Sequence, residues 1–138
     1  MNIDSIINGI VIDHITAGKG MKIYQLLELD KLNSSVALIR NVNSTKMGKK
    51  DIIKIDCDMD INMDILGFVD PGVTVDIIRG GNLIEKKKID LPEKLTNIIF
   101  CKNPRCITAT EQEIKHVFKL TDKEKKIYRC IYCESKAE

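Results

Sequence analysis

Four cysteines near the carboxyl end of the chain constrain its fold more than any other feature. They form two short pairs, C-K-N-P-R-C at residues 101–106 and C-I-Y-C at residues 130–133. Each pair can lie on a tight turn that points both sulfurs at one position, and four thiolates complete a tetrahedral zinc site without an open coordination position. The spacing therefore predicts a structural metal site, with zinc as the expected ion and iron as the second choice. Its ligands would be Cys101, Cys106, Cys130 and Cys133.

Pairing of the same cysteines in two disulfides is the alternative, and it requires an oxidising compartment. The first residues, M-N-I-D-S-I-I-N-G, contain neither the basic region nor the long apolar run of a secretory signal. We therefore expect a cytoplasmic protein with reduced thiols. The fifth cysteine, Cys57, lies in a strand-like segment and is expected to be a buried, inert thiol, because the chain has only two histidines that could activate it.

Composition is typical of a compact globular protein and argues against two classes of partner. Hydrophobic residues make up 43% of the chain and charged residues 30%, and no apolar stretch approaches the length of a membrane span. The net charge is only +2, and three Phe and three Tyr provide few rings for stacking on bases. Neither a membrane nor a nucleic acid is therefore the expected partner. A nucleic-acid-binding zinc-ribbon protein stays as the alternative, favoured by the basic residues Lys123, Lys125, Lys126 and Arg129.

Pro92 marks the expected boundary between two domains, residues 1–92 and 93–138. The proline interrupts the preceding strand-like segment, and the first cysteine pair follows a few residues later. A domain as small as the second seldom buries enough apolar surface to fold unaided, so we expect it to depend on the metal. The apolar residues available for its core are Ile98, Ile99, Phe100, Val117, Phe118, Leu120, Ile127 and Tyr128.

The first domain alternates between strand-like and helix-like segments. Strands are predicted over residues 9–15, 35–42, 50–57, 73–78 and 83–89. Helices are predicted over residues 23–32 and 59–68. This β-α-β-β-α-β order with one extra strand predicts an α+β fold with a ferredoxin-like antiparallel sheet and both helices on one face. The second domain is predicted to be a small all-β unit of the zinc-ribbon type.

Strand periodicity assigns the side chains of residues 50–57 to two faces of the predicted sheet. Ile53 and Ile55 would face the core, and Lys50, Ile52 and Lys54 would face the opposite side. Two lysines that flank an apolar residue can bind a flat ligand with attached negative charge. Lysines on a strand face are more often simply solvated, so the periodicity alone leaves both interpretations open.

Several motifs occur together along the chain in a specific order. They are G-I-V-I-D-H-I at residues 9–15, M-G-K-K-D-I-I-K-I at 47–55, L-P-E-K at 91–94, and the two cysteine pairs. In this combination the chain resembles the regulatory chain of aspartate carbamoyltransferase over nearly its whole length. The resemblance implies a non-catalytic allosteric subunit of de novo pyrimidine biosynthesis that binds nucleoside triphosphates, with CTP and ATP as the main effectors and UTP as a further candidate. It also implies homodimers joined through the first domain, and zinc domains docked on catalytic trimers, with three regulatory dimers joining two trimers.

The resemblance also implies roles for individual residues of an effector site. Asp13 would accept hydrogen bonds from the ribose, and Lys54 would reach the ribose and the base. His14, Lys50 and Lys86 would face the phosphates, whose negative charge suits flexible ammonium groups. The apolar walls, the backbone contacts and the base-reading end are expected from Ile6, Val11, Ile52, Asp76 and Leu83. No G-x-x-x-x-G-K-[ST] motif is present, which argues against nucleotide hydrolysis.

Three positions depart from the pattern of that family. Asp76 stands where asparagine is frequent, Gly81 where an aromatic residue is frequent, and Ile7 where a basic residue is expected. These changes predict weaker or altered discrimination between nucleotides. In the first metal loop, Asn103 and Arg105 are the residues expected to reach a catalytic chain. Because four cysteine ligands leave no open position on the metal, no catalytic residues are expected.

Overall fold

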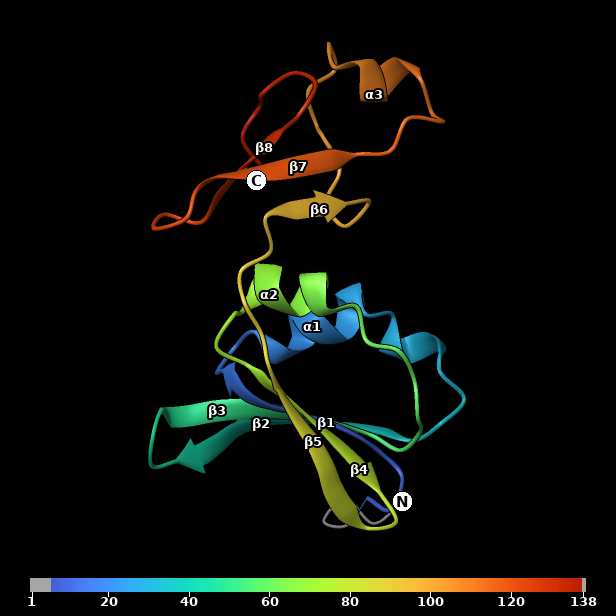
Figure 1. Ribbon diagram of the computed structural model, residues 1–138, viewed down its shortest axis with the longest axis vertical. Helices are drawn as coiled ribbons and strands as arrows, with labels where there is room; N and C mark the ends of the chain where they lie inside the picture. The colour runs from blue at the N-terminus through green and yellow to red at the C-terminus, as the bar shows by residue number, and fades with distance from the viewer. Residues whose placement is uncertain (1–5, 138) are drawn as a thin grey trace. The chain divides into compact units, whose positions relative to one another are not determined.

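The computed structural model describes residues 6–137, and the chain divides between Asp90 and Leu91 into two compact units. We call them the N-terminal unit and the C-terminal unit (Figure 1). Within the described residues, no helix is both long enough and apolar enough to cross a membrane.

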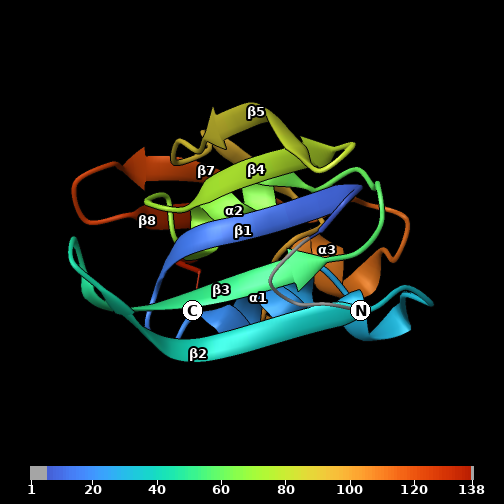
Figure 2. The same cartoon turned by 90° about the horizontal axis from the view of Figure 1, so that it is seen from below.

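An antiparallel sheet of five strands forms the frame of the N-terminal unit. The strands are β1 (Gly9–Thr16), β2 (Val36–Ser44), β3 (Gly48–Ile55), β4 (Thr74–Arg79) and β5 (Asn82–Lys88). They lie in the order β2-β3-β1-β4-β5. Helices α1 (Gly20–Leu26) and α2 (Met63–Val69) cover one face of this sheet, as Figures 1 and 2 show from two directions. Without the edge strand β5, this is a β-α-β-β-α-β unit, so the predicted ferredoxin-like α+β fold is confirmed.

Alternating apolar residues of the central strands form a core between the sheet and the two helices. Ile10 pairs with Ile55 and Ile12 with Ile53, and all four side chains are at most 2% exposed. Burial of one face at a period of two fixes this register, because a slip by one residue would turn the isoleucines toward solvent. Cys57 packs against the same core as a free thiol, but it is only partly buried, whereas a buried thiol was predicted.

The first predicted helix, residues 23–32, is wrong in its extent. Helix α1 ends at Leu26, and a separate 3-10 turn, η1, follows at Leu29–Lys31. Glu28 separates the two pieces because its backbone is left-handed, with φ +55°, a conformation that no continuous helix contains. This break turns Leu29 into the core, where its side chain is 1% exposed.

The second predicted helix, residues 59–68, begins later than expected, at Met63. Asn62 is its N-cap, because the Asn62 side chain accepts a hydrogen bond from the Asp64 backbone N–H at 3.0 Å. The helix then runs to Val69. The strands, in contrast, all begin and end within two residues of their predicted positions.

The C-terminal unit is built on a small antiparallel sheet with the strand order β6-β7-β8. Its elements are β6 (Lys94–Thr96), the single-turn helix α3 (Ile107–Thr110), β7 (Val117–Asp122) and β8 (Ile127–Cys130). Leu95, Phe118 and Tyr128 form its core, each at most 2% exposed. The predicted small β region with a cysteine cluster is confirmed. The assignment of Phe100 to the core is wrong, since its ring is 59% exposed.

Candidate metal centre and effector site

The four predicted cysteine ligands come together in the C-terminal unit. Their Sγ atoms all lie within 4.8 Å of one another. Cys101 and Cys133 are 3.5 Å apart at sulfur, and Cys106 and Cys130 are 3.7 Å apart. A tetrahedral metal with metal–sulfur bonds of about 2.3 Å needs sulfurs separated by about 3.8 Å. These residues therefore suit a structural metal bound by four thiolates.

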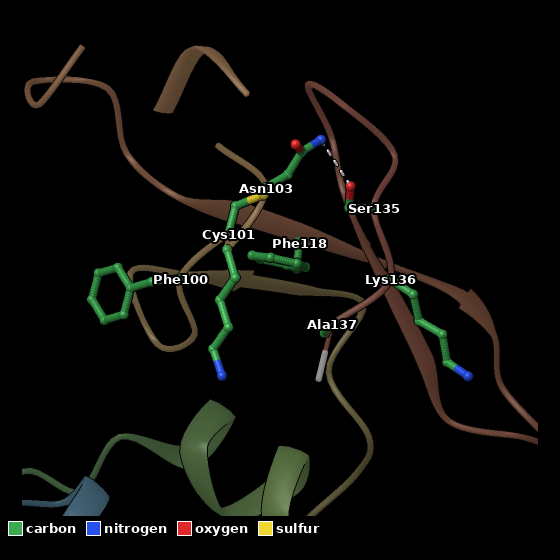
Figure 3. Close-up of a pocket in the computed structure, with 8 residues that line it drawn as sticks. Phe100, Cys101, Asn103, Phe118, Ser135, Lys136 and Ala137 are labelled. Atoms are coloured by element: carbon green, nitrogen blue, oxygen red, sulfur yellow. Dashed lines mark hydrogen bonds between the residues drawn. The ribbon is translucent and has the colours of Figure 1, made fainter. Parts of the chain in front are cut away.

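Two turns hold the cysteine pairs in this arrangement. In the first, the Asn103 side chain accepts a hydrogen bond from the Arg105 backbone N–H at 3.0 Å, and the Asn103 carbonyl accepts one from the Cys106 N–H. In the second, the backbone N–H of Cys130 donates to the Ser135 carbonyl. The Asn103 amide also donates to Ser135 Oγ at 3.2 Å, which joins the two turns directly (Figure 3).

Hydroxyl groups contact two of the sulfurs. Thr108 Oγ1 donates to Cys106 Sγ at 3.1 Å, and Ser135 Oγ lies 3.2 Å from Cys133 Sγ. The Ser135 contact lowers the pKa of the Cys133 thiol to about 6. Burial raises the pKa of the Cys101 thiol to about 12. Hydrogen bonds of this kind stabilise thiolate charge and orient the ligands of a metal.

Sequence reasoning missed Thr108, Ser135 and His116 as parts of this centre. Thr108 lies two positions after Cys106, and Ser135 lies two positions after Cys133. This repeated spacing of a hydroxyl residue from a cysteine was the sequence signal that could have identified both. His116 is not a metal ligand. Its Nδ1 accepts a hydrogen bond from the Cys101 backbone N–H at 3.0 Å, so the ring supports the first cysteine turn.

A cavity of about 270 Å³ adjoins the cysteine cluster. Figure 3 shows the side chains around it, including the exposed Phe100 and Lys136. Further exposed apolar residues lie next to the ligands in the chain, namely Ile107, Ile131 and Tyr132. Of the two residues predicted to contact a partner, Arg105 is exposed, whereas Asn103 is half-buried and engaged in the turn contacts. The metal centre therefore underlies a surface with apolar and basic groups.

The residues predicted for an effector site lie mostly on the face of the N-terminal sheet opposite α1 and α2, which we call the outer face. In the strand register, Lys54 of β3 pairs with Val11 of β1, Val11 pairs with Asp76 of β4, and Asp76 pairs with Lys86 of β5. Directly paired residues of antiparallel strands point to the same side of a sheet. These residues therefore form one row across four strands.

Asp13 and His14 enter the outer face through a β-bulge in β1. The register with β3 shifts within residues 12–15, and His14 has a left-handed backbone with φ +59°. Bulges of this type re-aim side chains at functional sites. His14 Nδ1 lies 3.0 Å from Thr74 Oγ1, and the His14 backbone N–H donates to Asp13 Oδ1. Lys50 Nζ lies 3.0 Å from the same Asp13 oxygen.

The Asp13–Lys50 ion pair is shielded from solvent, with side chains 21% and 16% exposed. Burial on its own would raise the pKa of Asp13, but the hydrogen bond from Lys50 and the nearby His14 backbone hold that pKa below its usual value. Asp13 is therefore ionised at neutral pH and can accept hydrogen bonds.

Asp76 is in a different electrostatic state. Its Oδ1 atom is buried and has no hydrogen-bond partner within residues 6–137. Burial raises the pKa of Asp76, and the charge of Lys86 opposes this shift only in part. The outer face thus contains two carboxylates whose environments differ.

The remaining predicted site residues surround this row. Ile52 is half-buried between the two lysines of β3, and Leu83, opposite Ile78, is 56% exposed. Ile6 precedes the first residue of β1 by three positions and is 7% exposed, with its side chain packed over Gly9. Lys86 is exposed.

Comparison with known proteins assigns the two units to two domains of the same family of proteins. Residues 1–90 match the allosteric domain of the aspartate carbamoyltransferase regulatory chain, and residues 93–138 match its metal binding domain. A regulatory chain of this enzyme from Bifidobacterium longum is 47% identical over 138 residues, covering 100% of this chain and 99% of the relative. Those from Clostridium botulinum and Clostridium tetani are each 52% identical and cover 97% of this chain, and 92% and 94% of their own lengths. The chain therefore belongs to the family of aspartate carbamoyltransferase regulatory chains.

Proposed function

We propose that this chain is the non-catalytic allosteric subunit of a cytoplasmic aspartate carbamoyltransferase in de novo pyrimidine biosynthesis. Nucleoside triphosphates bind the outer face of the N-terminal unit, and the C-terminal unit docks on catalytic chains. The observation that carries the proposal is the row that joins Lys54, Asp76 and Lys86 beside the Asp13–Lys50 pair. It presents ammonium groups and an ionised carboxylate on one surface, where they can bind phosphates and a ribose.

In this proposal, the polarity of the outer face sets the orientation of the nucleotide. His14, Lys50 and Lys86 bind the triphosphate, while Asp13 accepts hydrogen bonds from the ribose hydroxyls and Lys54 reaches the ribose and the base. Val11 and Ile52 supply apolar contact, with Leu83 and Ile6 at the end of the sheet near Gly81. CTP and ATP are the expected effectors and UTP is a further candidate. Gly81 provides no ring to pack on the base, so we expect reduced discrimination between bases.

Docking on the catalytic chain is assigned to the loops that hold the metal, for which zinc is the proposed ion. Four thiolates and a tetrahedral arrangement suit zinc, which needs no fixed geometry from its d electrons. Exposed apolar side chains are adjacent to the ligands in the sequence, and such patches commonly mark protein interfaces. The residues proposed to contact a catalytic chain are Phe100, Asn103, Arg105, Ile107, Ile131 and Tyr132.

The proposed assembly contains two catalytic trimers joined by three regulatory homodimers, each paired through its N-terminal units. A nucleotide that binds one quaternary state more tightly than the other shifts their equilibrium by the difference in binding free energy, typically 1–3 kcal/mol. No chemistry is required of the regulatory chain itself.

Mixing the zinc-loaded chain with its catalytic trimers tests this proposal. We expect a larger particle by light scattering, and an aspartate saturation curve that CTP and ATP displace. Lys50→Ala should weaken nucleotide binding by about tenfold, since it removes a phosphate contact and leaves Asp13 unpaired.

Lys46→Ala is the matched control, because Lys46 is an exposed lysine in the loop between β2 and β3. It should leave the nucleotide response unchanged. A mixture that forms no larger particle contradicts the docking role, and a saturation curve that no nucleotide displaces contradicts the allosteric role.

A further inference from the structure

Asp76 differs from the other polar residues of the outer face because its Oδ1 atom is buried without a hydrogen-bond partner among residues 6–137. Buried polar oxygens nearly always have a partner, since desolvation without compensation costs free energy. Asp76 lies in β4 between Val11 of β1 and Lys86 of β5. Burial raises its pKa, and Lys86 offsets only part of that shift. The ionised form of this carboxyl is therefore less stable here than it would be in water.

The charged groups that face Asp76 come from three neighbouring strands. They are Asp13 and His14 of β1, Lys50 and Lys54 of β3, and Lys86 and Lys88 of β5. Lys50 is already paired with Asp13 at 3.0 Å. Lys86 is the strongest of the charges that favour ionised Asp76, and Asp13 is the neighbour that disfavours it.

A triphosphate on this face changes the balance around Asp76 in one direction. Asp76 was expected at the base-reading end, but its partner on β5 is Lys86, a proposed phosphate ligand. A bound triphosphate therefore adds negative charge beside a carboxylate that is already close to Asp13, and it competes for Lys86. Both effects favour the neutral carboxyl form, since like charges raise a carboxyl pKa and loss of a cation does the same. A neutral carboxyl group also gains an O–H that can donate to an oxygen of the ligand.

We infer that proton uptake by Asp76 from solvent accompanies the binding of a nucleoside triphosphate, so that effector affinity rises as the pH falls. This inference rests on the proposed effector site. It adds that nucleotide binding at this site is coupled to protonation of the Asp76 carboxyl. By linkage, a reaction that takes up a proton becomes less favourable as pH rises through the range between the carboxyl pKa values of the free and the bound protein. Asp76 is then the residue that sets the pH response of the site.

The test compares ATP binding by the zinc-loaded full chain and its Asp76→Asn variant, by calorimetry at a series of pH values. Asparagine has the shape of the neutral carboxyl form but takes up no proton. We expect the variant to bind ATP about fivefold more tightly than the wild type at mildly alkaline pH, where it avoids one like charge. The ratio should fall toward one as the pH becomes acidic. Over the pH range in which this ratio changes, buffers of different ionisation enthalpy should show greater proton uptake by the wild type.

Protonation of ATP itself contributes to both proteins and cancels in the ratio. Asp56→Asn is the control for removal of an exposed carboxylate next to β3, and it should bind ATP like the wild type. A ratio that does not change with pH, or an Asp76→Asn variant that binds more weakly throughout, overturns the proton uptake while leaving the effector site in place. Absence of ATP binding by the wild type at every pH overturns the effector site and the proton uptake together.

Discussion

The buried carboxylate of Asp51 connects the scaffold of the N-terminal unit to its outer face. Its side chain is fully buried and accepts three backbone hydrogen bonds, from Gly18 and Gly20 at 3.0 Å each and from Asn41 at 3.1 Å. Gly18 lies in the turn before α1, Gly20 is the first residue of α1, and Asn41 lies where the register between β2 and β3 shifts. Because side chains alternate along a strand, fixing Asp51 on the inner side directs Lys50 to the outer face.

Replacement of Asp51 should be among the most destabilising changes in the N-terminal unit. Asp51→Ala leaves three backbone N–H groups without their acceptor, and we expect a loss of about 3 kcal/mol in the free energy of unfolding. Urea denaturation followed by circular dichroism measures this loss. Asp56→Ala, which removes an exposed carboxylate five positions later, should change the free energy of unfolding by less than about 0.5 kcal/mol. Equal stability of the two variants would contradict this role for Asp51.

At the scale of elements, the strands were predictable and the helix ends were not. Alternation of isoleucines in β1 and β3 follows directly from burial of one face, so the sequence contains the signal. The end of α1 depends on the left-handed backbone of Glu28, and nothing in a glutamate indicates that conformation. Helix α1 therefore ended earlier than its apolar spacing suggested.

The same distinction applies to the two candidate sites. Paired cysteines at short spacing indicate a metal site without knowledge of the fold, because each pair needs only its own turn. The outer face depends on pairing between distant strands, such as Val11 with Asp76, and strand periodicity could place only Lys50 and Lys54 together. The other residues were predicted through resemblance to a family. Thr108 was missed because its contact with sulfur depends on the turn at α3.

Thr108, in the turn at α3, should contribute to metal binding, because its side chain is 5% exposed and its hydroxyl donates to Cys106 Sγ. Thr108→Val keeps the shape of the side chain and removes the donor. We expect metal affinity to fall by about tenfold, the lower end of effects from residues that support metal ligands. Competition with a chromophoric chelator measures this affinity. Thr110→Val, an exposed position in the same helix, is the control, and a Thr108→Val chain with unchanged affinity would show that the hydroxyl is dispensable.

At the scale of the whole molecule, the two units have different sources of stability. The N-terminal unit buries a continuous layer of isoleucine, leucine and valine side chains between its sheet and helices. In the C-terminal unit, the buried hydrophobic residues are Leu95, Phe118 and Tyr128 together with two of the cysteines. So small a core seldom offsets the conformational entropy of its chain, and metal binding then supplies folding free energy directly.

Removal of the metal should consequently separate the two functions proposed for the chain. With a strong chelator, we expect backbone amides of residues 91–137 to lose protection from hydrogen exchange, while amides of β1 and β3 keep theirs. The chelated chain should no longer join catalytic trimers, yet it should bind ATP within about twofold of the metal-loaded chain, because the outer face draws no residue from the C-terminal unit. Hydrogen-exchange mass spectrometry and calorimetry on the same sample measure both effects, and added zinc should restore assembly. Protected amides in residues 91–137 after complete removal of the metal would mean that this small core folds by itself.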